Sequence, residues 1–90
     1  MTKRAVIKAH GLVIGVFFRA YVSKKAEELE LVGSVNNETD GTVKIISEGE
    51  EENLKKLIEY CKVGPKFAKV DRVEVEWEEA SGAFNKFEII

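Results

Sequence analysis

The sequence predicts an α+β domain in which two helices cover one face of an antiparallel sheet. Two observations favour this class: several short segments alternate apolar and charged residues, and two longer segments carry apolar residues at helical spacing. The chain has 90 residues, of which 44% are hydrophobic and 33% are charged. This length and balance suit one compact domain that buries its own core. We therefore expect a single domain over residues 1–90.

The first third of the chain predicts a strand followed by a helix. Ala5, Ile7 and Ala9 alternate with more polar neighbours over residues 4–10, which is the period of a strand. After a stretch punctuated by glycines, four apolar residues recur on one helical stripe. They are Phe18, Val22, Ala26 and Leu29.

The middle of the chain predicts a β-hairpin and then a second helix. Residues 33–37 and 42–47 are strand-like, and the turn residues Thr39-Asp40-Gly41 lie between them. From Glu50 onward the period becomes helical, and acidic residues at its start suit the positive end of the helix dipole. The apolar stripe consists of Leu54, Leu57, Ile58 and Cys61, and Gly64-Pro65 ends the helix.

The last third of the chain predicts two further strands. Val73, Val75 and Trp77 alternate with glutamates, and Phe87 and Ile89 alternate with polar residues near the C-terminus. The order is then β-α-β-β-α-β with a short final strand. This is the split βαβ arrangement of the ferredoxin-like sandwich, with an antiparallel sheet and both helices on one face.

Charge and cysteine content exclude several classes of protein. The 14 basic and 16 acidic residues give a net charge of -2, so no strong positive field attracts nucleic acid. The single cysteine cannot form an internal disulfide, and no stretch approaches the ~20 apolar residues of a membrane helix. We expect a cytoplasmic protein without a signal peptide, acting without membrane or nucleic acid.

The segment from Gly11 to Arg19 has the character of an anion site. It joins the first strand to the first helix, where glycines allow successive N–H groups to point into one concavity and the helix N-terminus adds unpaired donors. Arg19 lies in the first turn and can offer a bidentate guanidinium to phosphate oxygens. From spacing alone, a purely structural turn with a surface arginine is an equally good interpretation.

Two motifs resemble those of the acylphosphatase family. Residues 11–19 read GLVIGVFFR and are similar to the family pattern GxVxGVxFR. Residues 35–43 read VNNETDGTV and are similar to VxNxxDGxV. Family-like features continue at Glu48-Gly49, Gly64-Pro65, Gly82 and Phe87, so that the resemblance covers nearly the whole chain.

The resemblance implies an acid-anhydride hydrolase that splits the carboxyl–phosphate bond of acyl phosphates. By position, Arg19 and Asn37 become the catalytic residues, with Asn37 orienting the attacking water. The phosphate-binding residues become Ile14, Gly15, Val16, Phe17, Phe18 and Arg19. Phosphoryl transfer to water needs mainly positioning and charge stabilisation, and a carboxylate leaves readily, so we expect no metal and no cofactor. The expected partner is a small acyl phosphate, and the expected state is a monomer.

Three residues depart from the common family pattern. Ile14 stands where glutamine is usual and must keep an ordinary backbone conformation, because isoleucine tolerates positive φ poorly. Glu30 replaces a glycine, so that the first helix lacks its easiest left-handed cap. Ser34 replaces an aromatic residue and removes some packing. We expect these changes to affect stability and tuning more than the reaction.

Other interpretations were weighed against this one. A non-catalytic phosphate-binding or regulatory module would keep the glycine loop without needing the asparagine, and an RNA-binding domain would show a basic sheet with exposed aromatics. His10 is expected to be an ordinary strand-end histidine, and Cys61 a buried core thiol. Phe17 and Tyr21 either line the substrate entrance or pack under the loop.

Overall fold

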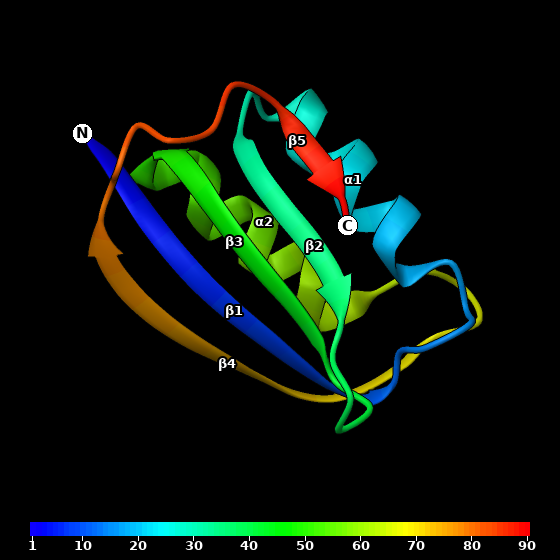
Figure 1. The fold of residues 1–90 in the computed structure, drawn as a ribbon. Coiled ribbons are helices and arrows are strands. Elements are labelled where there is room, and N and C mark those ends of the chain that lie inside the picture. The colour runs from blue at the N-terminus through cyan, green and yellow to red at the C-terminus, as the bar shows by residue number, and fades with distance from the viewer.

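The structure is a computed structural model that describes residues 1–90. Five strands and two helices follow one another in the predicted order. Their bounds are β1 Thr2–Leu12, α1 Phe18–Glu28, β2 Val32–Asn37, β3 Val43–Glu50, α2 Glu51–Val63, β4 Lys69–Glu79 and β5 Phe87–Ile89 (Figure 1). No helix combines the length and the apolar character needed to cross a bilayer.

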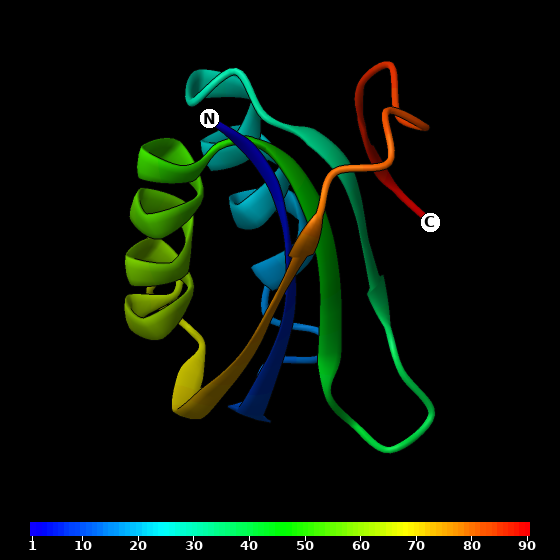
Figure 2. The same ribbon diagram turned by 90° about the vertical axis from the view of Figure 1, so that its left-hand side faces the viewer.

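The strands form one sheet in the order β4-β1-β3-β2-β5. The pairs β1–β3, β1–β4 and β2–β3 are antiparallel, and both helices lie on one side of the sheet (Figure 2). The predicted ferredoxin-like sandwich is therefore confirmed. The short C-terminal strand adds a feature that periodicity does not specify, because β5 pairs in parallel with β2 and makes the sheet mixed.

The predicted strands were too short at their ends. Periodicity placed the first strand at residues 4–10, whereas β1 runs from Thr2 to Leu12 because it pairs with strands on both sides. Likewise β4 begins at Lys69, where residues without alternation continue the ladder with β1. Helix α2 begins at Glu51, and Glu50 is its N-cap residue. Backbone pairing with a neighbour extends strands beyond the residues whose side chains alternate.

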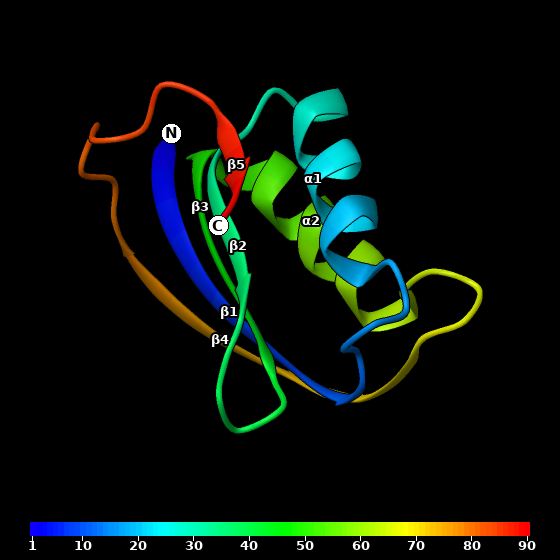
Figure 3. The ribbon, with the colours of Figure 1, turned by 45° about the vertical axis from the view of Figure 1, so that its right-hand side comes forward.

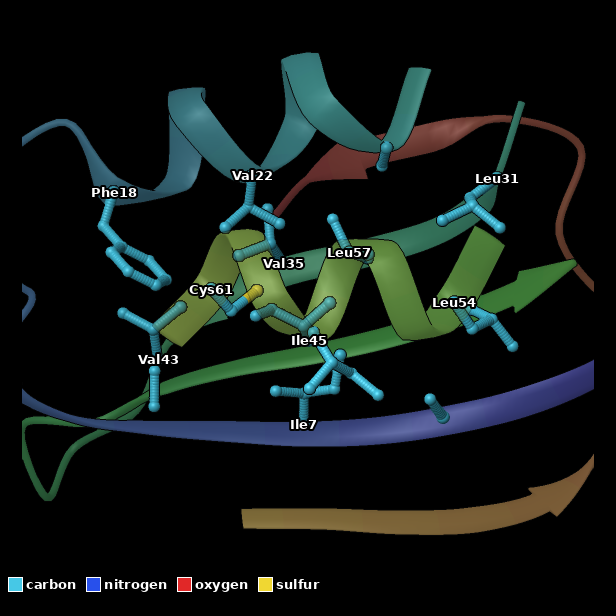
Figure 4. Packing of buried hydrophobic residues seen from close by; sticks show 14 of the residues in the cluster. Ile7, Phe18, Val22, Leu31, Val35, Val43, Ile45, Leu54, Leu57 and Cys61 are labelled. Atoms are coloured by element: carbon cyan, nitrogen blue, oxygen red, sulfur yellow. The ribbon is translucent and has the colours of Figure 1, made fainter. Parts of the chain in front are cut away.

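The core lies between the helices and the covered face of the sheet (Figure 4). Ile7 and Ile45 from the sheet meet Leu57 and Cys61 from α2, and Val22 from α1 packs near Val35 (Figure 4). These side chains are fully or almost fully buried. Their positions are those of the apolar periodicity, so the predicted helical stripes of both helices are confirmed as core.

The opposite face of the sheet is crossed by the connection from β4 to β5 (Figure 2). Glu48 on β3 holds this connection, although its carboxylate is only 3% exposed. It accepts hydrogen bonds from Ser81 N at 2.8 Å, Gly82 N at 3.1 Å and the Ser81 hydroxyl at 2.8 Å, and it pairs with Arg4 Nε at 2.7 Å. Burial alone would raise the pKa of Glu48, but these donors outweigh burial and lower the pKa to about 2.

Candidate active site

The candidate site lies where the carboxyl ends of β1 and β2 meet the N-terminus of α1. Both strands run antiparallel to β3 and hence parallel to each other, so their carboxyl ends share one end of the sheet. Figure 3 shows the β1–α1 connection and the β2–β3 hairpin at this end of the molecule. The fold therefore brings the two sequence motifs to the same region.

The β1–α1 connection uses two left-handed residues. Gly15 has φ 73°, and Phe17, the N-cap of α1, has φ 66°. Positive φ is unusual for an aromatic residue, so that Phe17 stores local backbone strain. Ile14 lies outside the positive-φ region, which confirms the expectation that it keeps an ordinary backbone conformation.

Consecutive backbone donors in this connection lack intramolecular acceptors. The first N–H of the α1 region to donate to a backbone carbonyl is that of Tyr21, which binds Phe17 O at 3.0 Å. No N–H from Ile14 to Ala20 donates to another backbone group. No side chain caps the helix, and its first turn contains no acidic residue. The segment thus presents a run of free donors at the positive end of a helix dipole.

A pocket of about 310 Å³ opens beside these donors. Its lining comes from the connection, the first turn of α1 and β5: Val13, Gly15, Phe17, Phe18, Arg19, Ala20 and Ile89. Arg19 is half-buried and takes part in none of the ion pairs of the structure. Its guanidinium is therefore available to an anion in the pocket.

The two asparagines of the second motif face opposite sides of the sheet. Asn37 pairs with Val43, whose side chain is buried in the core, so Asn37 faces the helices. Asn36 pairs with Lys44 on the opposite face and donates to Glu38 Oε2 at 3.3 Å. Asn37 Oδ1 is buried and has no hydrogen-bond partner. An unpaired buried acceptor is costly, and such groups occur at functional sites.

The phosphate loop and Asn37 are linked through Phe18 and Val43. Figure 4 shows the ring of Phe18, at the start of α1, pointing toward Val43 on β3. Val43 is the cross-strand partner of Asn37. Both apolar side chains are buried, at 1% and 0% exposure, and so they fix the helix start against the sheet at the level of Asn37.

The hairpin turn beside Asn37 is held by Asp40. Its Oδ1 accepts hydrogen bonds from the Thr42 hydroxyl at 2.6 Å and from Thr42 N at 3.1 Å, and Oδ2 pairs with Lys8 at 2.9 Å. The hydrogen bond from the Thr42 hydroxyl, followed by that from Lys8, holds the pKa of Asp40 well below its usual range. Asp40 therefore acts as an ionised turn residue that fixes the end of β2.

The comparisons with known proteins agree with this arrangement. The acylphosphatase family profile matches residues 5–89. A curated acylphosphatase of Chloroflexus aurantiacus is 44% identical over 87 residues, covering 97% of this chain and 95% of its own length. One of Pelotomaculum thermopropionicum is 41% identical over 86 residues, covering 96% and 94%. This chain belongs to the acylphosphatase family. The predicted membership is thus confirmed, and the protein is an acylphosphatase enzyme.

The solved structures of the family support the same fold. The crystal structure of acylphosphatase from Bacillus subtilis superposes with a TM-score of 0.94 at 34% identity, covering 100% of this chain and 99% of the other. Because the coverage is nearly complete in both directions, the ferredoxin-like sandwich of this chain matches a whole acylphosphatase.

The structure brings some of the predicted site residues of this acylphosphatase together and leaves others outside the pocket. Gly15, Phe17, Phe18 and Arg19 line the pocket. Val16 packs against the core and Ile14 is 38% exposed, so neither contributes lining. Asn37 is not a lining residue either. Ile89 is the residue that sequence reasoning missed, because only the docking of β5 beside α1 places it there.

The remaining side chains that were weighed have structural roles. Cys61 is fully buried, and burial raises the pKa of its thiol to about 12, which confirms the interpretation as a core thiol. The Tyr21 hydroxyl donates to Tyr60 O at 3.2 Å, so Tyr21 packs between the helices. His10 Nε2 lies 2.9 Å from Glu74 Oε2 on the outer face of the sheet. No group of three or more histidines, cysteines or carboxylates is clustered as metal ligands.

Proposed function

We propose that this acylphosphatase hydrolyses acyl phosphates with the phosphate held by residues 14–19 and the water positioned by Asn37. The observation that carries the proposal is the run of unpaired N–H groups from Ile14 to Ala20 beside the uncommitted Arg19. Backbone donors at a helix N-terminus together with one guanidinium suit the three oxygens of a phosphoryl group.

The proposed reaction needs only water as co-reactant. The water oxygen forms a bond to phosphorus while the bond between phosphorus and the acyl oxygen breaks, and the electron pair leaves with the carboxylate. The products are the carboxylate and inorganic phosphate, which retains the transferred proton. Arg19 and the N–H groups stabilise charge on the phosphoryl oxygens, and the leaving carboxylate needs no general acid.

Asn37 is suited to orient water because its Oδ1 is an unpaired acceptor. The oxygen is enclosed in the free protein, so the carboxamide has to turn about its Cβ–Cγ bond to present Oδ1 to a water at the pocket. Catalytic contacts of this kind commonly tighten only when substrate binds. The enclosed amide oxygen then exchanges an unsatisfied site for a hydrogen bond as the reaction begins.

The two roles separate in a phosphate titration combined with steady-state kinetics on folded variants. Arg19→Ala removes the bidentate partner of phosphate, so we expect affinity for inorganic phosphate to fall roughly 10- to 100-fold and turnover to collapse. Arg19→Lys keeps the charge without the planar fork and rescues little. Arg72→Ala, on exposed β4, is the matched control.

Asn37→Ala removes a contact to water and not to phosphate. We expect phosphate to bind with nearly unchanged affinity while kcat falls by roughly 10² or more, which is about 2.7 kcal/mol of transition-state stabilisation. Asn36→Ala is the matched control because it truncates the neighbouring side chain on the opposite face. Equal loss of phosphate binding in Asn37→Ala and Arg19→Ala would contradict the water-positioning role.

A non-catalytic phosphate-binding module is the alternative function that the same assay tests. It would bind inorganic phosphate through Arg19 but release no carboxylate from an acyl phosphate. We expect hydrolysis to continue when a chelator is present and inorganic phosphate to inhibit competitively, because product and substrate share one cradle. Phosphate binding without turnover would select the module.

A further inference from the structure

We propose that the pocket beside the phosphate loop is a subsite for the acyl group, formed by Phe17 and Ile89, and that it selects acyl phosphates with apolar or aromatic acyl groups. This inference rests on the proposed function, because it names the substrate class of the same site. It adds to that function a specificity determinant on β5, a strand that contains no part of either motif.

The lining of the pocket is mostly apolar. Apart from Gly15 and Arg19, its residues are hydrophobic, and Arg19 is the only ionisable one. A phosphate alone would not need such walls, because its oxygens gain nothing from apolar contact. Ligand pockets typically combine apolar walls with a few polar groups that fix orientation. Here the polar groups suit the phosphoryl end, and the apolar walls suit what is attached to it.

Phe17 is the first wall. Its side chain is 73% exposed even though its backbone adopts a left-handed conformation that aromatic residues seldom take. Packing within the domain therefore does not account for the aromatic ring at this position. An exposed ring that lines a pocket gains burial when an apolar group enters, and strained residues of this kind gather at ligand sites.

Ile89 is the second wall. β5 pairs in parallel with β2, so that Ile89 lies beside Val35 and faces the helices, close to the start of α1 (Figure 1). Its side chain is 48% exposed, which leaves apolar area to be covered. Its neighbour Ile90 is 69% exposed and does not line the pocket. The two isoleucines therefore provide a site residue and an adjacent control of the same chemistry.

The charge of the pocket sets the other half of the selectivity. Arg19 is the only cation in the lining, and the phosphoryl group occupies it in the proposed complex. An acyl group that carries its own carboxylate would find no second cation and would be brought against apolar side chains. Desolvating an unpaired charge is unfavourable, so such substrates are disfavoured.

The kinetic test compares acetyl phosphate, benzoyl phosphate and 4-carboxybenzoyl phosphate, after subtraction of spontaneous hydrolysis. We expect the wild type to have its highest kcat/KM for benzoyl phosphate. Ile89→Ala lowers kcat/KM for benzoyl phosphate roughly 5- to 20-fold and leaves acetyl phosphate within about twofold, as expected when a hydrophobic wall is shortened. Ile89→Lys shifts the preference toward 4-carboxybenzoyl phosphate, and Ile90→Ala changes none of the three.

A binding arm uses phosphonates, which cannot be hydrolysed at an acyl–phosphate bond. Phenylphosphonate should bind more tightly than methylphosphonate to the wild type, and Ile89→Ala should abolish most of that difference. Equal affinity for both, or equal loss for acetyl and benzoyl phosphate in Ile89→Ala, overturns the inference while the hydrolytic function stands. No turnover of any acyl phosphate, with the phenylphosphonate preference intact, overturns the proposed function and retains the subsite.

Discussion

Glycine residues at the two ends of the phosphate loop meet different surroundings. Gly11 and Gly15 both have positive φ, at 127° and 73°. A Cβ added to Gly11 would collide with the carbonyl oxygen of Lys69 on β4, next to the irregularity in the β1–β4 ladder. A Cβ added to Gly15 has no atom within 4 Å. Gly11 is thus needed for packing of the sheet edge, and Gly15 for the conformation and space of the pocket.

This difference predicts that the two alanine variants fail in different ways. Gly15→Ala should cost only about 1 to 2 kcal/mol through its left-handed backbone but should weaken phosphate binding, because its methyl group adds bulk at the pocket lining. Gly11→Ala should lose roughly 3 kcal/mol or more through the collision. Urea unfolding and phosphate titration measure both effects. Greater destabilisation by Gly15→Ala than by Gly11→Ala would refute this assignment.

At the site, sequence patterns predicted the residue types but not the backbone geometry. The motifs identified Gly15 and Arg19, and the pocket contains both. Nothing in the sequence indicated that Phe17 takes a left-handed conformation, because glycine and asparagine are the usual residues there. The unpaired Oδ1 of Asn37 was also not predictable, since it depends on which neighbours fail to supply a donor.

Among the elements, α1 ends in a manner that its sequence disfavours. Glu30 has φ 58°, and Leu31 N binds Ala26 O at 2.9 Å while Glu30 N binds Glu27 O at 3.0 Å. This is the Schellman pattern, in which glycine usually holds the left-handed position. The expectation that glutamate removes the easiest cap is thus refined: the cap forms with glutamate, at the cost of left-handed strain.

We therefore predict that Glu30→Gly raises the free energy of unfolding by about 0.5 to 1 kcal/mol. The gain in the left-handed region exceeds the entropy that glycine adds to the unfolded chain. Glu27→Gly is the control, because the same change within the helix should cost about 1 kcal/mol. Thermal unfolding should show opposite shifts of a few degrees for the two variants. A loss of stability in both would show that Glu30 is not strained.

Element order was predictable because each helix and long strand carries its own apolar period. The alternation of Ala5, Ile7 and Ala9 and the stripe of Leu54, Leu57 and Ile58 are local, and they point inward in the structure. The pairing of β5 with β2 is not local. It depends on a connection that crosses the whole sheet, so Phe87 and Ile89 gave no information about their neighbours.

At the scale of the whole molecule, one charged group joins both edges of the sheet. Glu48 lies on β3, pairs with Arg4 on β1, and binds Ser81 and Gly82 in the connection between the edge strands β4 and β5. In the sequence it resembles any solvated strand glutamate. Its burial arises because the connection folds over it, which alternation cannot reveal. By holding this connection, Glu48 also helps to place β5, and with it Ile89, at the pocket.

The depressed pKa of Glu48 predicts a specific dependence of stability on pH. The pKa is about 2 in the folded protein against 4.5 as the model value, so the unfolded state binds the proton first as pH falls. The contribution of the ionised carboxylate is therefore complete above about pH 5 and is lost between about pH 5 and 2. A shift of this size corresponds to about 3 kcal/mol near neutral pH.

Glu48→Gln should accordingly lower the free energy of unfolding by about 3 kcal/mol at pH 7, because Arg4 and the two N–H donors lose an ionised acceptor. The difference from the wild type should shrink as the pH is lowered toward 3, since the wild-type carboxylate then begins to lose its advantage. Urea unfolding of both proteins at several pH values measures this. Glu76→Gln, on the exposed outer face of β4, is the control and should change stability little at any pH. A difference between Glu48→Gln and the wild type that stays constant from pH 7 to pH 3 would contradict the role of an ionised Glu48.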